Sequence, residues 1–200
     1  MAAPRRLVVA TRNEHKLREL AEILAGIELA PLPDGVELPP ETGETFAENA
    51  LTKVRAAHRA TGDAAIADDS GIVARALGGR PGVRSARYAG PGAGDAENLE
   101  LLIAELEGAA DRRLAYVCVI AYADADGREE LFEGRCEGEL ADEPRGSGGF
   151  GYDPAFVPAD TGPADGRTMA ELDPGEKHAI SHRGRAARAL AEHLGLRGAP

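Results

Sequence analysis

The sequence predicts an α/β fold built on a mixed β-sheet. In the first part of the chain, short apolar runs alternate with amphipathic helical patterns, which is the order found in sheets with crossover helices. In the second part, strand-like runs over 113–123 and 129–138 flank an Asp-Ala-Asp-Gly turn, so we expect these two runs to pair directly. The 200 residues contain no repeat, low-complexity tract or long linker, which predicts a single domain over residues 1–200.

The first strand and helix should follow one another directly. Residues 7–10 form a continuous apolar run, typical of a buried strand. The next helix begins either at Thr11, with Glu14 completing a capping box, or at the competing cap Asn13. Its apolar face has helical spacing and consists of Leu17, Leu20, Ala21 and Leu24. A short strand over 27–30 and a proline-rich loop over 31–43 are expected after it.

The second helix has clearer ends. Thr45 and Glu48 form a capping box, and Gly62 marks the C-terminus. The buried face between them is expected to comprise Phe46, Ala47, Ala50, Leu51, Val54 and Ala57. Further helices are expected over 98–106, 168–172 and 182–194, with a strand over 64–67 and an irregular segment over 144–165.

Charge and composition exclude several classes of protein. With 23 basic and 34 acidic residues, the net charge of −11 argues against binding a nucleic-acid polymer or an anionic membrane through bulk charge. No apolar run approaches the ~18 residues of a spanning helix, and residues 1–6 lack the apolar stretch of a signal peptide. Two cysteines, Cys118 and Cys136, are too few for a disulfide framework or a zinc site. We therefore expect a soluble, cytoplasmic protein.

The junction between the first strand and the first helix is a candidate phosphate site. A helix N-terminus presents backbone N–H groups and the positive end of the helix dipole, and side chains there add further donors. The candidate residues are Thr11, Arg12, Asn13, Glu14, His15 and Lys16. The alternative is a capped helix with an exposed lysine. Only three of the 23 basic residues are lysines, which makes the positions of Lys16, Lys53 and Lys177 worth examining.

Two acidic segments are candidates for a metal site. Asp68 and Asp69 follow an apolar strand, at the end of the strand where open α/β sheets bind ligands. Because neighbours on a strand point to opposite faces, only one would face a given cleft unless the chain turns at Ser70-Gly71. Glu41 lies in the loop before the second helix and could complete a Mg²⁺ site. The alternative for each segment is a set of solvated acids.

Two later segments suggest contacts to a flat anionic ligand. The glycine-rich run 146–151 is followed by Tyr-Asp-Pro rather than by a helix, so it is not a dinucleotide fingerprint. We interpret it as a loop that lets backbone, Phe150 and Tyr152 approach a ligand closely. Residues 176–184 concentrate Lys177, His178, Ser181, His182 and Arg183 near a helix start, where the helix dipole disfavours cations unless an anion binds.

Taken together, these segments resemble the inosine triphosphate pyrophosphatase family, also called dITP/XTP pyrophosphatase. The matching motifs are Thr11-Arg-Asn-x-x-Lys16, Glu41-Thr-Gly43, Thr45-Phe46, Glu48-Asn-Ala50, Ala67-Asp-Asp-Ser-Gly71, Ser85-Ala-Arg-Tyr88, Gly148-Gly-Phe-Gly-Tyr-Asp-Pro154, Glu176-Lys177 and Ser181-His-Arg-Gly184. They are ordered and span nearly the whole chain. One departure is Arg12, where the family more often has glycine.

The resemblance implies a homodimer with an elongated mixed sheet flanked by helices, and a central cleft between two lobes. It also implies Mg²⁺-dependent hydrolysis of ITP, dITP or XTP to the monophosphate and pyrophosphate, which removes deaminated purines from the nucleotide pool. In that case Asp69 is the general base, Glu41 and Asp69 hold the metal, and Thr11 to Lys16 hold the phosphates. Further substrate-binding positions are Ser70, Phe150, Gly151, Tyr152, Asp153, Lys177, His182 and Arg183.

Base selection in such an enzyme should depend on hydrogen bonds. Hypoxanthine and xanthine present a 6-oxo acceptor, whereas adenine presents a donor, so Arg183 or a backbone N–H would distinguish them. Two alternatives remain: a nucleotide sensor that binds without rapid hydrolysis, and a pyrophosphatase for modified pyrimidine or general nucleotides.

Overall fold

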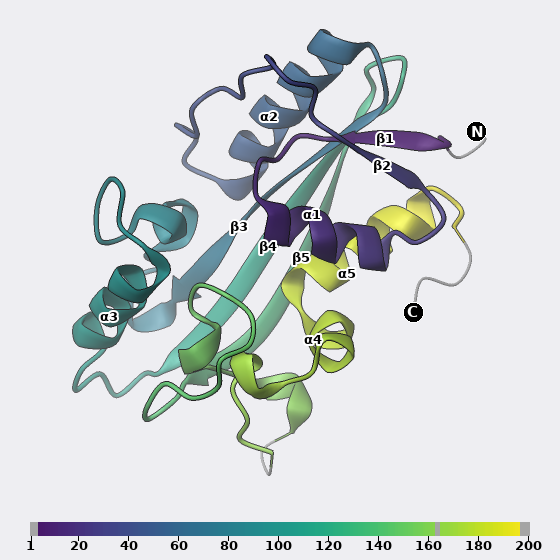
Figure 1. The fold of residues 1–200 in the computed structure, drawn as a ribbon. Coiled ribbons are helices and arrows are strands. Elements are labelled where there is room, and N and C mark those ends of the chain that lie inside the picture. Colours follow the sequence, from purple (N-terminus) through teal and green to yellow (C-terminus); the bar gives the residue numbers. More distant parts are fainter. Residues whose placement is uncertain (1–3, 163–164, 197–200) are drawn as a thin grey trace. The chain divides into compact units, whose positions relative to one another are not determined.

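The computed structural model describes residues 4–162 and 165–196 (Figure 1). Residues 1–3 of the N-terminal segment and residues 163–164 of the segment expected to be irregular lie outside the described residues, as do residues 197–200. No helix in the described part of the chain is long and apolar enough to cross a membrane.

The sheet has six strands in the order β2-β1-β3-β4-β5-β6. Strand β1 (Arg6–Val9) pairs in parallel with β2 (Glu28–Pro31) and with β3 (Ala65–Ala74). Strand β5 (Glu129–Leu140) pairs antiparallel with β6 (Phe156–Pro158), and β4 (Arg113–Ala123) lies between β3 and β5. The predicted α/β class and mixed sheet are therefore confirmed.

Helices connect and flank these strands. The α-helices are α1 (Glu14–Ile23), α2 (Phe46–Thr61), α3 (Asp95–Glu105), α4 (Pro174–Ile180) and α5 (His182–His193). Short 3₁₀ helices are η1 (Arg75–Leu77), η2 (Gly82–Arg87), η3 (Asp153–Ala155), η4 (Ala159–Thr161) and η5 (Met169–Glu171).

The chain forms two compact units. Unit 1 consists of Met1–Asp69, Cys118–Gly134 and His182–Pro200, and unit 2 of Ser70–Val117 and Arg135–Ser181. The boundary between them falls within β3, β4 and β5. The single domain, the elongated shape and the cleft between lobes stay predictions.

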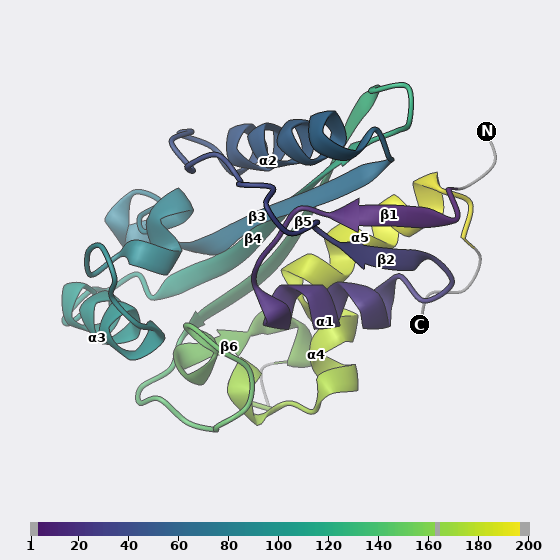
Figure 2. The ribbon, with the colours of Figure 1, turned by 45° about the horizontal axis from the view of Figure 1, so that its top comes forward.

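Unit 1 has apolar cores on both faces of its strands. Helices α1 and α5 cover one face, where Ile66 of β3 packs with Leu20 and Leu190 (Figure 2). Helix α2 covers the opposite face, where Ala65 and Ala67 of β3 pack with residues of α2. Because β3 is buried on both faces, its side chains alternate between two helical layers.

Local signals explain the ends of the first two helices. Of the two caps predicted for α1, Asn13 is correct: its side chain accepts from the amides of His15 and Lys16. The predicted apolar face is wrong at Ala21, which is exposed, because Ile23 is the residue buried beside Leu20. The capping box of α2 is confirmed, and its last residue is followed by Gly62 in the left-handed conformation.

The strand expected over 64–67 continues through Asp68 and Asp69 to residue 74, so a turn at Ser70-Gly71 is wrong. The glycine instead allows close packing within unit 2, because a Cβ at Gly71 would lie 2.4 Å from the Ser85 hydroxyl oxygen. That hydroxyl accepts from the amide of Ile72, and this bond fixes η2 against the strand. Asp68 and Asp69 therefore point to opposite faces of a continuous strand.

Unit 2 has its own core around β4, α3 and the segment 152–172. Two of its elements differ from the predictions. Strand β6 lies inside the segment expected to be irregular, and helix α4 was not predicted. Asp173 and Glu176 form the capping box of α4 and Pro174 occupies its first turn, so Lys177 and His178 lie in the last turn of α4 rather than at the start of α5.

Candidate active site

Two groups of candidate residues can be described, one in each unit. In unit 1, the adjacent carboxylates of β3 contact different helices. Asp68 lies on the face covered by α1 and α5, and Asp69 lies on the face covered by α2. Asp68 and Asp69 are therefore neighbours on β3 but lie in two different environments.

Asp68 is the buried anion of a cationic cluster. Its Oδ2 lies 3.0 Å from the Lys16 ammonium and accepts from Nε and Nη2 of Arg183 at 3.3 and 3.2 Å. Burial by itself would raise the pKa of Asp68, but Lys16, Arg183 and Lys53 outweigh it and hold the pKa well below the usual carboxyl range. Asp68 is therefore charged, and it holds the proposed phosphate lysine in place.

Arg183 is enclosed by carboxylates at the start of α5. Its side chain is 2% exposed, and Nη1 donates to Glu19 of α1 while the other nitrogens donate to Asp68. Neighbouring His182 is also buried. The contact of Arg183 with the 6-oxo group of a base stays a prediction, and it requires the guanidinium to face the substrate as well as these carboxylates.

On the opposite face of β3, Asp69 is held by α2. The side-chain amide of Asn49 donates to Oδ2 of Asp69 at 2.9 Å, and the Lys53 ammonium lies 3.6 Å from Oδ1. Lys53 also donates to the carboxylate of Glu41 and, at 2.7 Å, to the carbonyl of Asp68. Burial raises the pKa of Asp69, and Glu41 raises it further, whereas Lys53 and Asn49 lower it.

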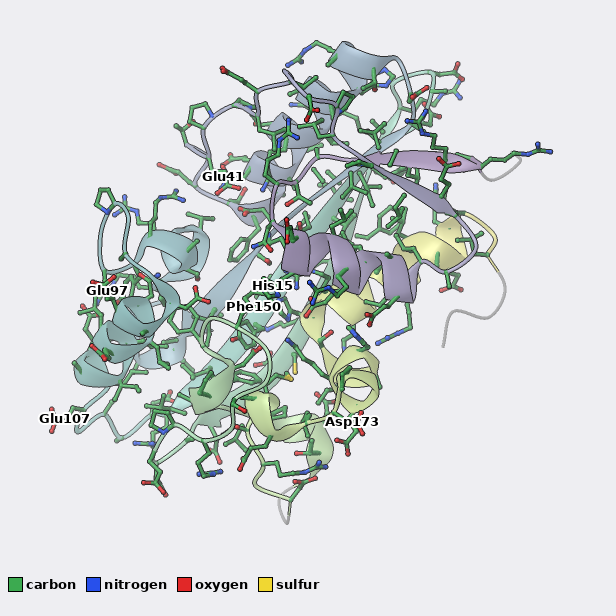
Figure 3. All side chains as sticks on the ribbon, in the orientation of Figure 1. His15, Glu41, Glu97, Glu107, Phe150 and Asp173 are labelled. Atoms are coloured by element: carbon green, nitrogen blue, oxygen red, sulfur yellow. The ribbon has the colours of Figure 1, made fainter. Side chains whose placement is uncertain are left out.

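Glu41 and Asp69 are the candidate residues for holding a magnesium ion. Glu41 lies on the loop before α2 (Figure 3), and both carboxylates contact the same ammonium, that of Lys53. The described residues contain no group of three or more His, Cys, Asp or Glu side chains suited to a metal. Mg²⁺ usually takes only one or two carboxylates and completes its coordination with water and substrate phosphates. The pair therefore suits an ion that binds together with the substrate.

The predicted phosphate segment forms the β1–α1 junction. The Thr11 hydroxyl accepts from the backbone amide of Asn13. The side chain of Asn13 in turn accepts from the backbone amides of His15 and Lys16. Asn13, Glu14 and His15 are exposed, and His15 lies in the first turn of α1 (Figure 3). Lys16 reaches Asp68 with a side chain that is 15% exposed.

Arg12 has a structural role that the sequence did not predict. Its Nη1 donates to the carbonyl of Leu32, and its Nη2 donates to those of Pro33 and Val36, each at 3.0 Å. The planar guanidinium thus holds the first part of the loop that carries Glu41. The phosphate contact expected of Arg12 stays a prediction.

In unit 2, Asp153 organises the candidate ligand-binding loop. It accepts from the amide of Phe150, the Lys177 ammonium and the Tyr116 hydroxyl. Lys177 also lies 5.0 Å from the centre of the Phe150 ring, a cation–π distance. Phe150 and Lys177, far apart in sequence, are therefore brought together by one buried carboxylate.

The other predicted residues of unit 2 have mainly structural contacts in this chain. Tyr152 is buried and donates to the carbonyl of Ser85 at 2.7 Å. The amide of Gly151 donates to Asp95, at the start of α3. Ser70 is half-buried on β3. Their substrate contacts stay predictions.

Sequence reasoning missed several residues of these groups: Glu19, Asn49, Lys53 as a carboxylate partner, and Tyr116. A signal existed for Lys53. It is one of three lysines in the chain, and it lies one helical turn after Asn49, so the two side chains share a face of α2. No comparable pattern marks Glu19 or Tyr116, because their partners are distant in sequence.

The mixed sheet with its flanking helices defines a protein of the α/β class. The chain belongs to the Ham1 family, whose model matches residues 7–193. It is 53% identical over 195 residues to a dITP/XTP pyrophosphatase of Symbiobacterium thermophilum, with 95% of each chain covered, and 48% identical to one of Geobacter sulfurreducens, covering 96% of this chain and 98% of the relative.

Solved structures agree with this membership. A HAM1 protein from Coxiella burnetii is 44% identical and has a TM-score of 0.85. The match covers 98% of this chain and 99% of that one. The Ham1 protein of Staphylococcus aureus is 38% identical with a TM-score of 0.84, covering 95% of this chain and 98% of that one. The family resemblance predicted from the motifs is confirmed.

Proposed function

We propose that this protein hydrolyses deaminated purine nucleoside triphosphates, namely ITP, dITP and XTP, to the monophosphate and pyrophosphate. The observation that carries the proposal is the cluster of Glu41, Lys53 and Asp69 in unit 1, in which two carboxylates flank one buried ammonium. The names of the relatives, dITP/XTP pyrophosphatases, support the substrate class. Removal of such nucleotides from the cellular pool is the role that follows.

Asp69 is the proposed general base. A water molecule attacks the α-phosphorus in line, its proton passes to Asp69, and the bond to the leaving pyrophosphate breaks. A general base must be deprotonated yet basic, and a buried carboxylate with a raised pKa that still faces an ammonium meets both needs. Asn49 orients the carboxylate by donating to Oδ2.

Charge on the triphosphate requires cations in a protein that carries a net charge of −11. Lys16 is proposed to contact the phosphates, and Asp68 keeps its ammonium in position. Thr11, Arg12, Asn13, Glu14 and His15 form the rest of the proposed phosphate segment. Mg²⁺, held by Glu41 and Asp69, would neutralise phosphate charge as it develops.

A second set of proposed substrate-binding residues lies in unit 2. The Phe150 ring offers a stacking surface for a purine, and Lys177 supplies a cation beside it. Ser70, Gly151, Tyr152 and Asp153 are the other proposed substrate-binding residues of unit 2. His182 and Arg183 are further proposed substrate-binding residues of unit 1. Homodimer formation, a cytoplasmic location and a single domain over residues 1–200 are proposed on the family resemblance.

A pyrophosphate-release assay tests the proposal. Purified protein is given ITP, dITP, XTP, ATP, GTP and a modified pyrimidine triphosphate, each with and without Mg²⁺. We expect rapid pyrophosphate release from ITP, dITP and XTP only when Mg²⁺ is present. Release from ATP and GTP should be far slower. Binding without turnover would identify a nucleotide sensor, and similar rates on all nucleotides would identify a general pyrophosphatase.

A further inference from the structure

Asp153 has both carboxylate oxygens engaged inside unit 2. Oδ1 accepts from the Tyr116 hydroxyl at 2.9 Å, and Oδ2 accepts from the Phe150 amide and the Lys177 ammonium, both at 3.0 Å. The side chain is nearly fully buried. A Cβ added at Gly149 would lie 2.0 Å from Oδ2 of Asp153. Only glycine at this position therefore lets the loop approach the carboxylate this closely.

Tyr116 fixes the other side of this carboxylate. It lies on β4, its ring packs 4.7 Å from that of Phe156, and it is 7% exposed. Burial, and then the adjacent Asp153, raise the pKa of the Tyr116 hydroxyl well above its usual value, and the hydroxyl donates to the carboxylate. A donor fixed on a buried strand removes the rotational freedom that Asp153 would otherwise have.

We propose that Tyr116 is a positioning residue that acts through Asp153 to fix the Lys177 ammonium and the Phe150 backbone. This inference rests on the proposed function, in which Lys177 and Phe150 bind substrate. Tyr116 itself need not touch the substrate. Its hydroxyl holds Oδ1, so that Oδ2 stays directed at both of its other partners.

Kinetics of Tyr116→Phe test this role. The substitution removes one hydroxyl and keeps the ring that packs on Phe156. Because a hydrogen bond to a charged group is worth roughly ten- to 150-fold in an equilibrium constant, we expect KM for ITP to rise by up to about that factor. We expect kcat to stay within about twofold, since Asp69 and its partners in unit 1 are unaltered.

Tyr122→Phe is the matched control. Tyr122 is a second buried tyrosine on the same strand, and it packs in the apolar core of unit 1 beside His193. If Tyr116 only supports the fold, the two substitutions should alter thermal stability alone and leave KM for ITP unchanged. Equal KM values in both variants and in the wild type would overturn the proposal.

A second measurement does not depend on turnover. Because the chain has only three lysines, reductive methylation with ¹³C-formaldehyde gives few NMR signals, and Lys177→Arg assigns the one from residue 177. We expect Tyr116→Phe to move the Lys177 signal and to leave those of Lys16 and Lys53 in place, whereas Tyr122→Phe moves none of them. An unmoved Lys177 signal in folded Tyr116→Phe would contradict the proposal even if the wild type showed no pyrophosphatase activity.

A double-mutant cycle with Asp153→Asn separates direct from indirect action. If Tyr116 acts through the carboxylate, adding Tyr116→Phe to Asp153→Asn should change KM for ITP by less than about twofold. Fully additive effects of the two substitutions would overturn a pathway through Asp153.

Discussion

Arg183, in the first turn of α5, donates two hydrogen bonds to Oδ2 of Asp68, a residue 115 positions earlier on β3. Asp68 of β3 and the basic start of the last helix therefore meet in one buried cluster of unit 1. Lys16 joins the same carboxylate oxygen from α1. The cluster ties three elements of unit 1 together through charge, and both arginine and aspartate depend on it for compensation of their burial.

Asp68→Asn should strongly destabilise the protein. The substitution leaves the buried guanidinium of Arg183 without its principal anion, and breaking a buried ion pair costs about 3–5 kcal/mol. Urea unfolding measures the loss. Asp63→Asn is the control, because the ion pair of Asp63 with Arg6 is exposed and should contribute less than about 1 kcal/mol.

The pH dependence of unfolding distinguishes this pair from a packing effect. The pKa of Asp68 in the folded state lies below its unfolded value, so its contribution to stability is present above about pH 4 and is lost as the pH falls further. We expect the free energy of unfolding to fall less steeply between about pH 5 and 2 in Asp68→Asn than in the wild type. Parallel curves would rule out this linkage.

Asp69→Asn should abolish most of the activity. If Asp69 accepts the proton of water, kcat should fall by roughly 10²–10⁴. Because burial raises the pKa of Asp69, we expect the acid limb of wild-type kcat/KM to lie above the ordinary carboxyl range, with activity lost as the pH falls through it. Asn49→Ala removes a hydrogen bond that lowers this pKa, so the limb should move to higher pH. A limb that stays in place would remove Asn49 from the proposed mechanism.

Arg12→Lys should loosen the loop that carries Glu41. Lysine keeps the charge but lacks the planar fork that reaches three carbonyls. We expect faster hydrogen exchange over residues 32–43 and a higher Mg²⁺ concentration for half-maximal activity. Arg18→Ala, which removes an exposed arginine from α1, is the control. Unchanged exchange with a raised KM for ITP would instead support the phosphate contact that the motif predicts.

Elements with strong local signals could be predicted from the sequence. The bounds of β4 follow from a continuous apolar run, and the capping box of α2 follows from Thr45 and Glu48. The continuation of β3 could not, because Asp-Asp-Ser-Gly is a poor strand sequence on its own. Its acids are stabilised by α1, α2 and α5, which are distant in sequence. Helix α4 was missed because its Pro-Gly start is typical of loops, although proline is well placed in a first turn.

Some residues of the candidate site could also be predicted from the sequence, whereas their contact partners could not. Lys16, Glu41 and Asp69 were predicted from motif spacing and family resemblance, and they lie in buried or half-buried ion pairs of unit 1. Each of the three lysines contacts a carboxylate, and the remaining Lys or Arg positions of the chain are all arginines. A lysine is a compact cation, and the ammonium of Lys53 contacts the carboxylates of both Glu41 and Asp69. The partners themselves required the three-dimensional arrangement.

Arg183→Lys separates a structural from a selective role of this arginine. A lysine at residue 183 cannot bridge Glu19 and Asp68 with a fork, so we expect the free energy of unfolding to fall by about 1–3 kcal/mol. If Arg183 also donates to the 6-oxo group of the base, the ratio of kcat/KM for ITP to that for ATP should fall at least about tenfold, since one such bond is worth about 1.4 kcal/mol. Glu19→Gln is the matched control, because it removes the charge that pairs with Arg183 but keeps the guanidinium itself. A variant that loses stability and keeps its preference for ITP would assign Arg183 to the core of unit 1 and leave base selection to other donors.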